Sequence, residues 1–140
     1  MAYNKTSRVG GNGGNSFSDD LTEMCQLIRV KIRHGKKIDA ITSVWRATAG
    51  NELQGTQHGG GGGEQSSFTL DEGEFINRIE GRSGDEIDQL TFFTNQGHKY
   101  GPYGGNGGSP FTLADLKVGG FWGRSEERLD AFGAFTVAAC

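Results

Sequence analysis

The sequence predicts an all-β protein in which three small four-stranded sheets surround a pseudo-threefold axis. Three observations support this prediction: short segments rich in β-branched and aromatic residues, a glycine tract that occurs three times, and a turn motif that also occurs three times. One such sheet could not bury its apolar face alone, whereas three sheets packed together share one core.

The segments between the tracts and the turns have the composition of β-strands. Residues 27–33 (LIRVKIR) and 90–94 (LTFFT) are rich in β-branched and aromatic residues, and Gly, Asn, Asp and Ser interrupt such runs at short intervals. The one helical signal, residues 113–118 (LADLKV), is too short for a stable helix. We therefore expect about twelve short strands in a single domain spanning 1–140, with residues 1–8 as a flexible arm or an exchanged strand.

Composition and charge exclude several classes of protein. Glycine accounts for 25 of 140 residues, but the chain has no Gly-X-Y period and two prolines, which excludes collagen. A net charge of −3 creates no strong attraction to nucleic acid, and no apolar run is long enough to span a bilayer. The N-terminus has no apolar signal region. We expect a mature secreted protein, and a cytoplasmic location stays open.

The glycine tracts are GGNGG (10–14), GGGGG (59–63) and GGNGG (104–108), and a phenylalanine follows each of them at a short interval. Glycine loses more backbone freedom on folding than any other residue, so a tract of this kind is costly to order. Three copies of the tract indicate a role that requires backbone without side chains.

The turn motif occurs as RHGKKIDAI (33–41), RSGDEIDQL (82–90) and RSEERLDAF (124–132). The copies align on Asp39, Asp88 and Asp130, with an apolar residue one position before and two positions after each acid. In the first two copies a glycine four residues before the acid (Gly35, Gly84) would allow a sharp turn with positive φ.

Such a turn presents amide donors beside an acceptor-only carboxylate, a combination that suits the neighbouring hydroxyls of a polyol. A glycine tract nearby adds another amide and lets a sugar ring approach the backbone. Gly-Asp turns are also what ordinary β-hairpins need. Three acids at one aligned position, each coupled to a tract, favour sugar binding over that simpler explanation.

Together with residues 92–109 (FFTNQGHKYGPYGGNGGS), these paired motifs resemble the jacalin-related lectins over roughly residues 9–138. The resemblance implies a β-prism of three four-stranded Greek-key sheets. It implies a lectin for mannose- or glucose-type glycans and glycoproteins, with no metal, no cofactor and no enzymatic activity. The internal tracts do not suggest the cut chain with a free terminal glycine that the galactose-binding branch uses.

The resemblance also implies site residues. The acid binds sugar hydroxyls, the two amides before it bind O5 and O6, and an amide of the tract completes the ring of contacts. Because the two chain ends meet in one sheet of a family prism, the first tract belongs with the last turn. The three expected sites combine Gly63 with Lys37, Ile38 and Asp39; Gly108 with Glu86, Ile87 and Asp88; and Gly14 with Arg128, Leu129 and Asp130.

Two departures from the family pattern predict unequal sites. Glu126 stands where the other copies have glycine, and a non-glycine residue held at positive φ costs on the order of 1 kcal/mol or more. We therefore expect that this turn relaxes differently from the other two or that the third site is weakened. Mannose-binding members of the family that the sequence resembles also carry tyrosine two positions before the acid, where this chain has Lys37, Glu86 and Arg128. Each site should then bind weakly, with several sites acting together on a branched glycan.

The sequence also bears on two other functions, an enzyme and a structural protein. The acid pairs Asp85 with Asp88 and Glu126 with Asp130 each lie on one tight turn, which does not favour a glycosidase. The histidines at 34, 58 and 98 lie beside glycines and are expected to be solvated. A β-prism that serves as a structural, matrix or biomineral interaction protein with weakened sugar binding stays open. We expect a homodimer, for which a disulfide through Cys140 is one candidate link.

Overall fold

The computed structural model describes residues 2–138, and in this range it consists of β-strands, turns and loops without any helix. Accordingly, no helix in this range could cross a membrane. The strands are β1 (Tyr3–Lys5), β2 (Val9–Gly10), β3 (Asn15–Ser18), β4 (Met24–His34), β5 (Ile38–Ala47), β6 (Glu52–Gln54), β7 (His58–Gly59), β8 (Glu64–Thr69), β9 (Ile76–Ser83), β10 (Ile87–Thr94), β11 (Lys99–Gly104), β12 (Ser109–Leu113), β13 (Val118–Ser125) and β14 (Leu129–Val137).

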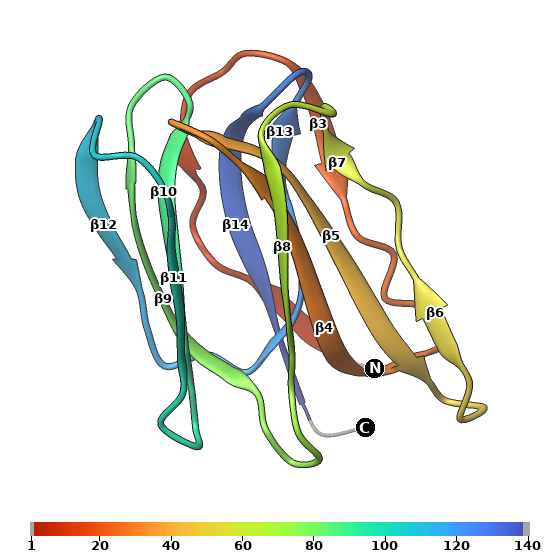
Figure 1. Ribbon diagram of the computed structural model, residues 1–140. Helices are drawn as coiled ribbons and strands as arrows, with labels where there is room; N and C mark the ends of the chain where they lie inside the picture. The colour runs from red at the N-terminus through yellow and green to blue at the C-terminus, as the bar shows by residue number, and fades with distance from the viewer. Residues whose placement is uncertain (1, 139–140) are drawn as a thin grey trace.

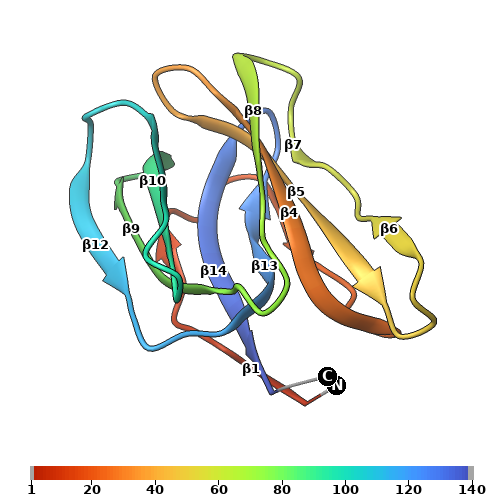
Figure 2. The same cartoon turned by 60° about the horizontal axis from the view of Figure 1, so that its bottom comes forward.

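The strands form three antiparallel sheets that face one another across a common axis (Figures 1 and 2). One sheet has the order β1-β14-β13-β3 with β2 also on β14, the second β11-β10-β9-β12, and the third β6-β5-β4-β8 with β7 also on β5. The first sheet contains both ends of the described chain, as expected. The prediction of an all-β fold with three sheets of about four strands is confirmed.

Each sheet has the same plan, built on one long hairpin. The hairpins are β4–β5, β9–β10 and β13–β14, and each carries one copy of the turn motif at its tip. The strand after each glycine tract pairs with the first strand of a hairpin, and the strand before the tract pairs with the second. The topology therefore brings every tract to the tip of a hairpin, at the top of Figure 1.

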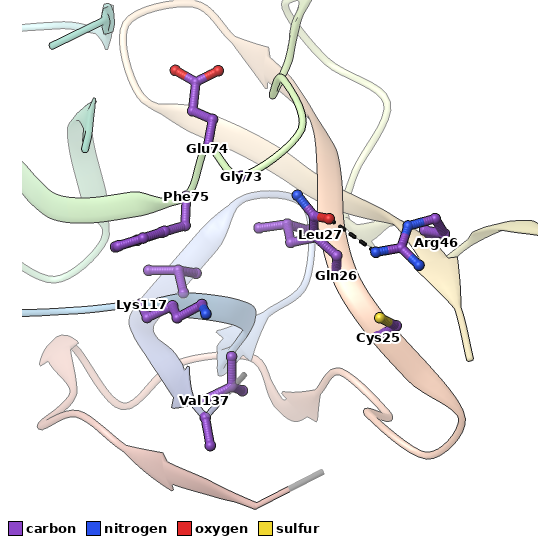
Figure 3. Close-up of a pocket in the computed structure, with 11 residues that line it drawn as sticks. Cys25, Gln26, Leu27, Arg46, Gly73, Glu74, Phe75, Lys117 and Val137 are labelled. Carbon is purple, nitrogen blue, oxygen red and sulfur yellow. Dashed lines mark hydrogen bonds between the residues drawn. The ribbon is translucent and has the colours of Figure 1, made fainter. Parts of the chain in front are cut away.

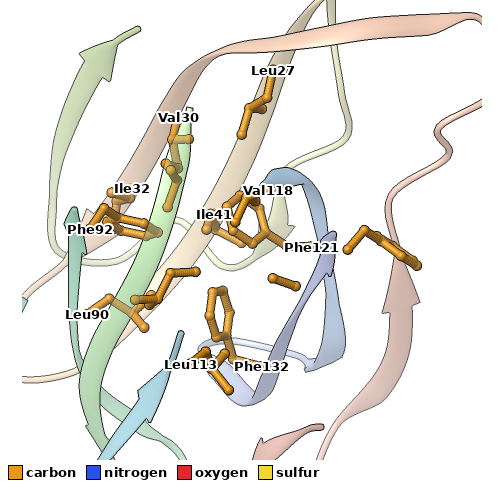
Figure 4. Close-up of a cluster of buried hydrophobic side chains, with 14 of the residues drawn as sticks. Leu27, Val30, Ile32, Ile41, Leu90, Phe92, Leu113, Val118, Phe121 and Phe132 are labelled. Atoms are coloured by element: carbon orange, nitrogen blue, oxygen red, sulfur yellow. The ribbon is translucent and has the colours of Figure 1, made fainter. Parts of the chain in front are cut away.

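The core fills the space between the three sheets (Figure 4). Val30, Ile79 and Phe121, which occupy equivalent positions upstream of the three turns, are fully buried. Phe92 of β10 packs against both of the other sheets. Its ring centroid lies 5.2 Å from the ring centroid of Phe68 in β8 and 6.2 Å from that of Phe121 in β13. Burial of these large apolar side chains supplies the main favourable term in folding.

Some expectations concern the ends of the chain. The N-terminal segment, for which the sequence suggests a flexible arm or an exchanged strand, contains β1, which pairs with β14 of the same chain from Tyr3↔Val137 to Lys5↔Phe135. Residues 113–118 form no helix; they run from the end of β12 through a loop to the start of β13. Cys140, the expected link between subunits, lies outside the described residues.

Candidate functional site

The three turn motifs form nearly identical bends at one end of the prism. In each bend the amide of the residue four before the acid donates to the carbonyl of the residue two before it. The donor–acceptor distances are 3.0 Å for Gly35 to Lys37, 3.0 Å for Gly84 to Glu86 and 3.1 Å for Glu126 to Arg128. The next residue, Ile38, Ile87 or Leu129, is fully buried and anchors the bend in the core.

Each glycine tract lies directly against the acid of one bend. Around Asp39, a Cβ added to Gly62 would lie 3.0 Å from Oδ1, and one added to Gly63 would lie 2.7 Å from Oδ2. The matching distances are 2.7 and 2.6 Å for Gly107 and Gly108 at Asp88, and 2.7 and 2.5 Å for Gly13 and Gly14 at Asp130. We call the three arrangements of bend, acid and tract the Asp39 cup, the Asp88 cup and the Asp130 cup. The structure brings together the tract and turn residues that the family resemblance pairs.

Backbone angles and close packing explain why four of the five tract positions are glycine. The first residue has a positive φ of 93–113°, and a Cβ on the second would lie 2.3–2.5 Å from a carbonyl oxygen of a neighbouring bend. The second residue of each tract donates its amide to the carbonyl of the same acid: Gly60 to Asp39 at 3.0 Å, Gly105 to Asp88 at 2.8 Å and Gly11 to Asp130 at 2.8 Å. The last residue has a positive φ of 66–71°, which glycine adopts without strain. The middle residue is free to vary, because a Cβ on Gly61 would meet nothing within 4 Å.

An arginine that begins each turn motif holds the tract in place. Arg33 donates from Nε to the Gly62 carbonyl and from Nη2 to the Gly63 carbonyl, both at 3.0 Å. Arg82 and Arg124 make the same forked contacts to Gly107 and Gly108 and to Gly13 and Gly14, at 2.7–3.0 Å. Sequence reasoning assigned no role to these residues. The signal was present, since an arginine stands six positions before the acid in all three copies.

Comparison with known proteins identifies the family. Residues 6–135 match the jacalin-like lectin domain. The chain belongs to this lectin family. Griffithsin from Griffithsia sp. is 37% identical over 129 residues, which cover 91% of this chain and 93% of that protein. Horcolin from Hordeum vulgare is 30% identical over 135 residues, covering 90% of this chain and 91% of horcolin.

Solved structures agree with this assignment. A mannose-specific jacalin-related lectin from Morus nigra, in complex with mannose, matches with a TM-score of 0.87 at 30% identity, covering 99% of this chain and 96% of that chain. Wild-type Malaysian banana lectin matches with a TM-score of 0.84 at 32% identity, covering 97% of this chain and 99% of that chain. The fold of this jacalin-like lectin is therefore the family's β-prism, and the family is one of lectins rather than enzymes.

The structure corrects the expected strain at Glu126 of the lectin. Neither Gly35 nor Gly84 has a positive φ, and among the described residues only Glu23 and Asp115 are non-glycine residues with one. A Cβ on Gly35 would meet only Asp39 Oδ2 at 3.9 Å and Gly63 Cα at 4.0 Å. The bend therefore has room for a side chain at this position. The third bend accommodates Glu126 without the predicted conformational cost.

The three side chains two positions before the acids meet between the cups of the lectin. Glu86 accepts a hydrogen bond from Arg128 Nε at 2.8 Å through Oε2, and its Oε1 lies 3.3 Å from Lys37 Nζ. Lys37 Nζ also lies 3.6 Å from Asp88 Oδ1. Burial opposes ionisation of Glu86, but the two cations outweigh it and lower the pKa of the carboxyl below its ordinary value. Lys37, Glu86 and Arg128 thus form one linked charge cluster.

The charge cluster makes the cups electrically different. The Asp130 cup has Glu86, Glu126 and Glu127 in its lining. Burial, followed by the charges of Glu86 and Glu126, raises the pKa of Asp130 above its ordinary value. The expectation of three unequal sites thus has a physical basis in the neighbours of each acid.

The opposite end of the lectin holds other polar groups. A pocket of about 280 Å³ lies there (Figure 3), with Gln26 and Arg46 hydrogen-bonded at 3.1 Å on one wall. Close by, ligand atoms of Asp71, Glu74 and His98 lie within 4.8 Å of one another, a spacing at which they could hold a cation. The Glu74 oxygens already accept hydrogen bonds from Thr94 Oγ1, His98 Nδ1 and the Asp71 amide, at 2.6–2.8 Å. These hydrogen bonds within the chain satisfy the buried Glu74 carboxylate.

The prediction that the histidines are solvated is wrong for His58, and His34 is only partly exposed. His34 is half-buried and its Nε2 lies 2.8 Å from Ser66 Oγ. The His58 side chain is 11% exposed, its Nε2 lies 2.8 Å from Asp19 Oδ1, and its ring stacks on Phe17. Their partners are distant in sequence, so a glycine beside a histidine is a poor guide to its exposure.

Proposed function

We propose that this lectin binds mannose- and glucose-type glycans through the three cups, without a metal ion. The proposal rests on one observation: three separate carboxylates at one end of the prism each lie against two bare glycines and a bend that is anchored by one buried residue. The hairpins do not need this arrangement in order to fold, so its presence in three copies supports a role in binding.

The chemistry of a cup matches that of a pyranose ring. An ionised carboxylate accepts hydrogen bonds from two neighbouring hydroxyls, while backbone amides donate to ring and hydroxyl oxygens. In the Asp39 cup we assign the first role to Asp39 and the second to the amides of Lys37, Ile38 and Gly63. The absence of side chains at Gly62 and Gly63 lets a ring approach the backbone.

The corresponding assignments hold for the other cups. The acids are Asp88 and Asp130, the turn amides are those of Glu86 and Ile87 and of Arg128 and Leu129, and the tract amides are those of Gly108 and Gly14. Support comes from the relatives, since a structurally similar lectin from Morus nigra is described as mannose-specific and was solved with mannose. Three shallow cups on one face allow several branches of a glycan to bind together.

Titration calorimetry tests the proposal. We expect methyl α-mannoside and methyl α-glucoside to bind with measurable heat, with more than one site per chain, and methyl α-galactoside to bind much less. Treatment with EDTA should leave the mannoside titration unchanged. If none of the three sugars bound, the lectin role would be rejected for this chain, and the reading as a structural or matrix protein would gain support.

A further inference from the structure

The pocket of the Asp39 cup is rich in cations. It has a volume of about 400 Å³, and its lining includes Lys36, Lys37 and Arg128 around the single carboxylate of Asp39. The pocket of the Asp130 cup has the opposite character, because Arg128 there faces the acids Glu86, Glu126, Glu127 and Asp130. When only the charged residues of each lining are counted, the Asp39 pocket has a net charge of +2 and the Asp130 pocket has a net charge of −3.

Two of the three cations are fixed by Glu86. The Arg128 guanidinium uses Nε in its hydrogen bond to Glu86, and the Lys37 ammonium lies beside the other oxygen of the same carboxylate. Glu86 itself is not part of the lining of the Asp39 pocket. The ion pairs therefore hold two cations at the border of the cup, while Lys36 on the exposed tip of the bend supplies the third.

We propose that the Asp39 cup prefers mannose-type sugars that carry an anionic substituent, such as a phosphate, a sulfate or a carboxylate, and that the Asp130 cup disfavours them. This inference rests on the proposed function, since it assigns a substrate class to one of the sugar cups. Asp39 and the amides hold the ring, and the substituent lies toward Lys36, Lys37 and Arg128.

The charges favour this assignment for physical reasons. A phosphate accepts hydrogen bonds on three oxygens and carries nearly two negative charges near neutral pH. Arginine and lysine supply donors to such a group without giving up their contacts to Glu86, because each has several N–H groups. At the Asp130 cup the same substituent would approach three carboxylates besides the binding acid, which is unfavourable.

The experiment isolates one cup at a time. Asp88→Asn with Asp130→Asn leaves the Asp39 cup, and Asp39→Asn with Asp88→Asn leaves the Asp130 cup. Each protein is titrated with methyl α-mannoside, α-mannose 1-phosphate and inorganic phosphate. For the protein with the Asp39 cup we expect the sugar phosphate to bind about three- to tenfold more tightly than the neutral sugar, the size of a solvent-exposed charge interaction. The protein with the Asp130 cup should show the reverse order.

Two controls separate a local charge effect from a general one. In the protein with the Asp39 cup alone, Lys36→Gln should weaken binding of the sugar phosphate and leave methyl α-mannoside unchanged. Lys31→Gln removes the same charge from β4, where Nζ lies 2.7 Å from Gln54 Oε1, and should change neither. Raising NaCl from about 50 to about 500 mM should reduce the preference for the phosphate, because salt screens exposed charges.

The outcomes are distinguishable. If the Asp39 cup binds the neutral sugar at least as tightly as the sugar phosphate, the inference is wrong and the proposed function stands. If inorganic phosphate binds as tightly as mannose 1-phosphate, the cations form an anion site that does not involve the sugar, which also overturns the inference. If no sugar binds, the proposed function fails and takes the inference with it.

Discussion

Replacing Asp19 with alanine is expected to lower the free energy of unfolding by about 3 kcal/mol. The Asp19 side chain is 2% exposed, and Oδ2 accepts hydrogen bonds from Ser43 Oγ at 2.8 Å and from the Phe121 amide at 2.9 Å. Its Oδ1 lies 2.8 Å from His58 Nε2. The variant would leave these buried donors without an acceptor. Thermal unfolding followed by circular dichroism should show a midpoint lower by roughly 10 °C.

Asp20 provides a matched control for this experiment. It is the next residue, it is exposed, and its carboxylate accepts a local hydrogen bond from the Thr22 amide at 2.9 Å. Asp20→Ala should therefore change stability by no more than about 1 kcal/mol, the usual range for loss of a turn or cap contact. Equal midpoints for the two variants would contradict the role of Asp19 as a link between two sheets.

Gly63→Ala is expected to weaken mannoside binding at the Asp39 cup by about tenfold or more. Gly63 has a φ of 71°, and an added Cβ would lie 2.5 Å from the His34 carbonyl oxygen and 2.7 Å from Asp39 Oδ2. A left-handed conformation costs a residue with a side chain about 1–2 kcal/mol, and 1.4 kcal/mol corresponds to a factor of ten. The bend or the acid would have to move. Calorimetry on the protein that retains only the Asp39 cup measures the effect.

Gly61→Ala is the control within the same tract. A Cβ on Gly61 would meet nothing within 4 Å, and its φ is not in the left-handed region. Binding by this variant should match that of its parent. If Gly61→Ala and Gly63→Ala reduced binding equally, the tract would act through its flexibility and not through its close packing against the acid.

The repeats made the fold predictable from the sequence, and the family resemblance that they carry made the pairing of tracts with turns predictable. Aligned apolar positions such as Ile38, Ile87 and Leu129 predicted a core shared by three equivalent sheets, and these residues are fully buried. The resemblance to the family's prism, in which the two chain ends share one sheet, predicted which tract lies beside which acid. Both inferences depend on patterns that recur along the chain, which a single sequence can reveal.

Features that depend on backbone angles or distant partners were not predictable. Sequence reasoning placed Gly35 at positive φ, whereas the left-handed residues of each cup are in the tract, as Gly63 shows. The partners of Asp19 come from β5, β7 and β13, so no local pattern indicates them. The contact between Glu86 and Arg128 likewise joins two hairpins 42 positions apart in the sequence.

The most direct test of the three cups is a titration of the variant Asp39→Asn, Asp88→Asn, Asp130→Asn with methyl α-mannoside, followed by NMR of the backbone amides. Asparagine keeps the shape of each acid but replaces an acceptor oxygen with a donor group. We predict that the wild-type protein shows shifts at Gly14, Gly63 and Gly108, and that the folded variant shows none. Unchanged binding by the variant would contradict the proposal that these carboxylates hold the sugar.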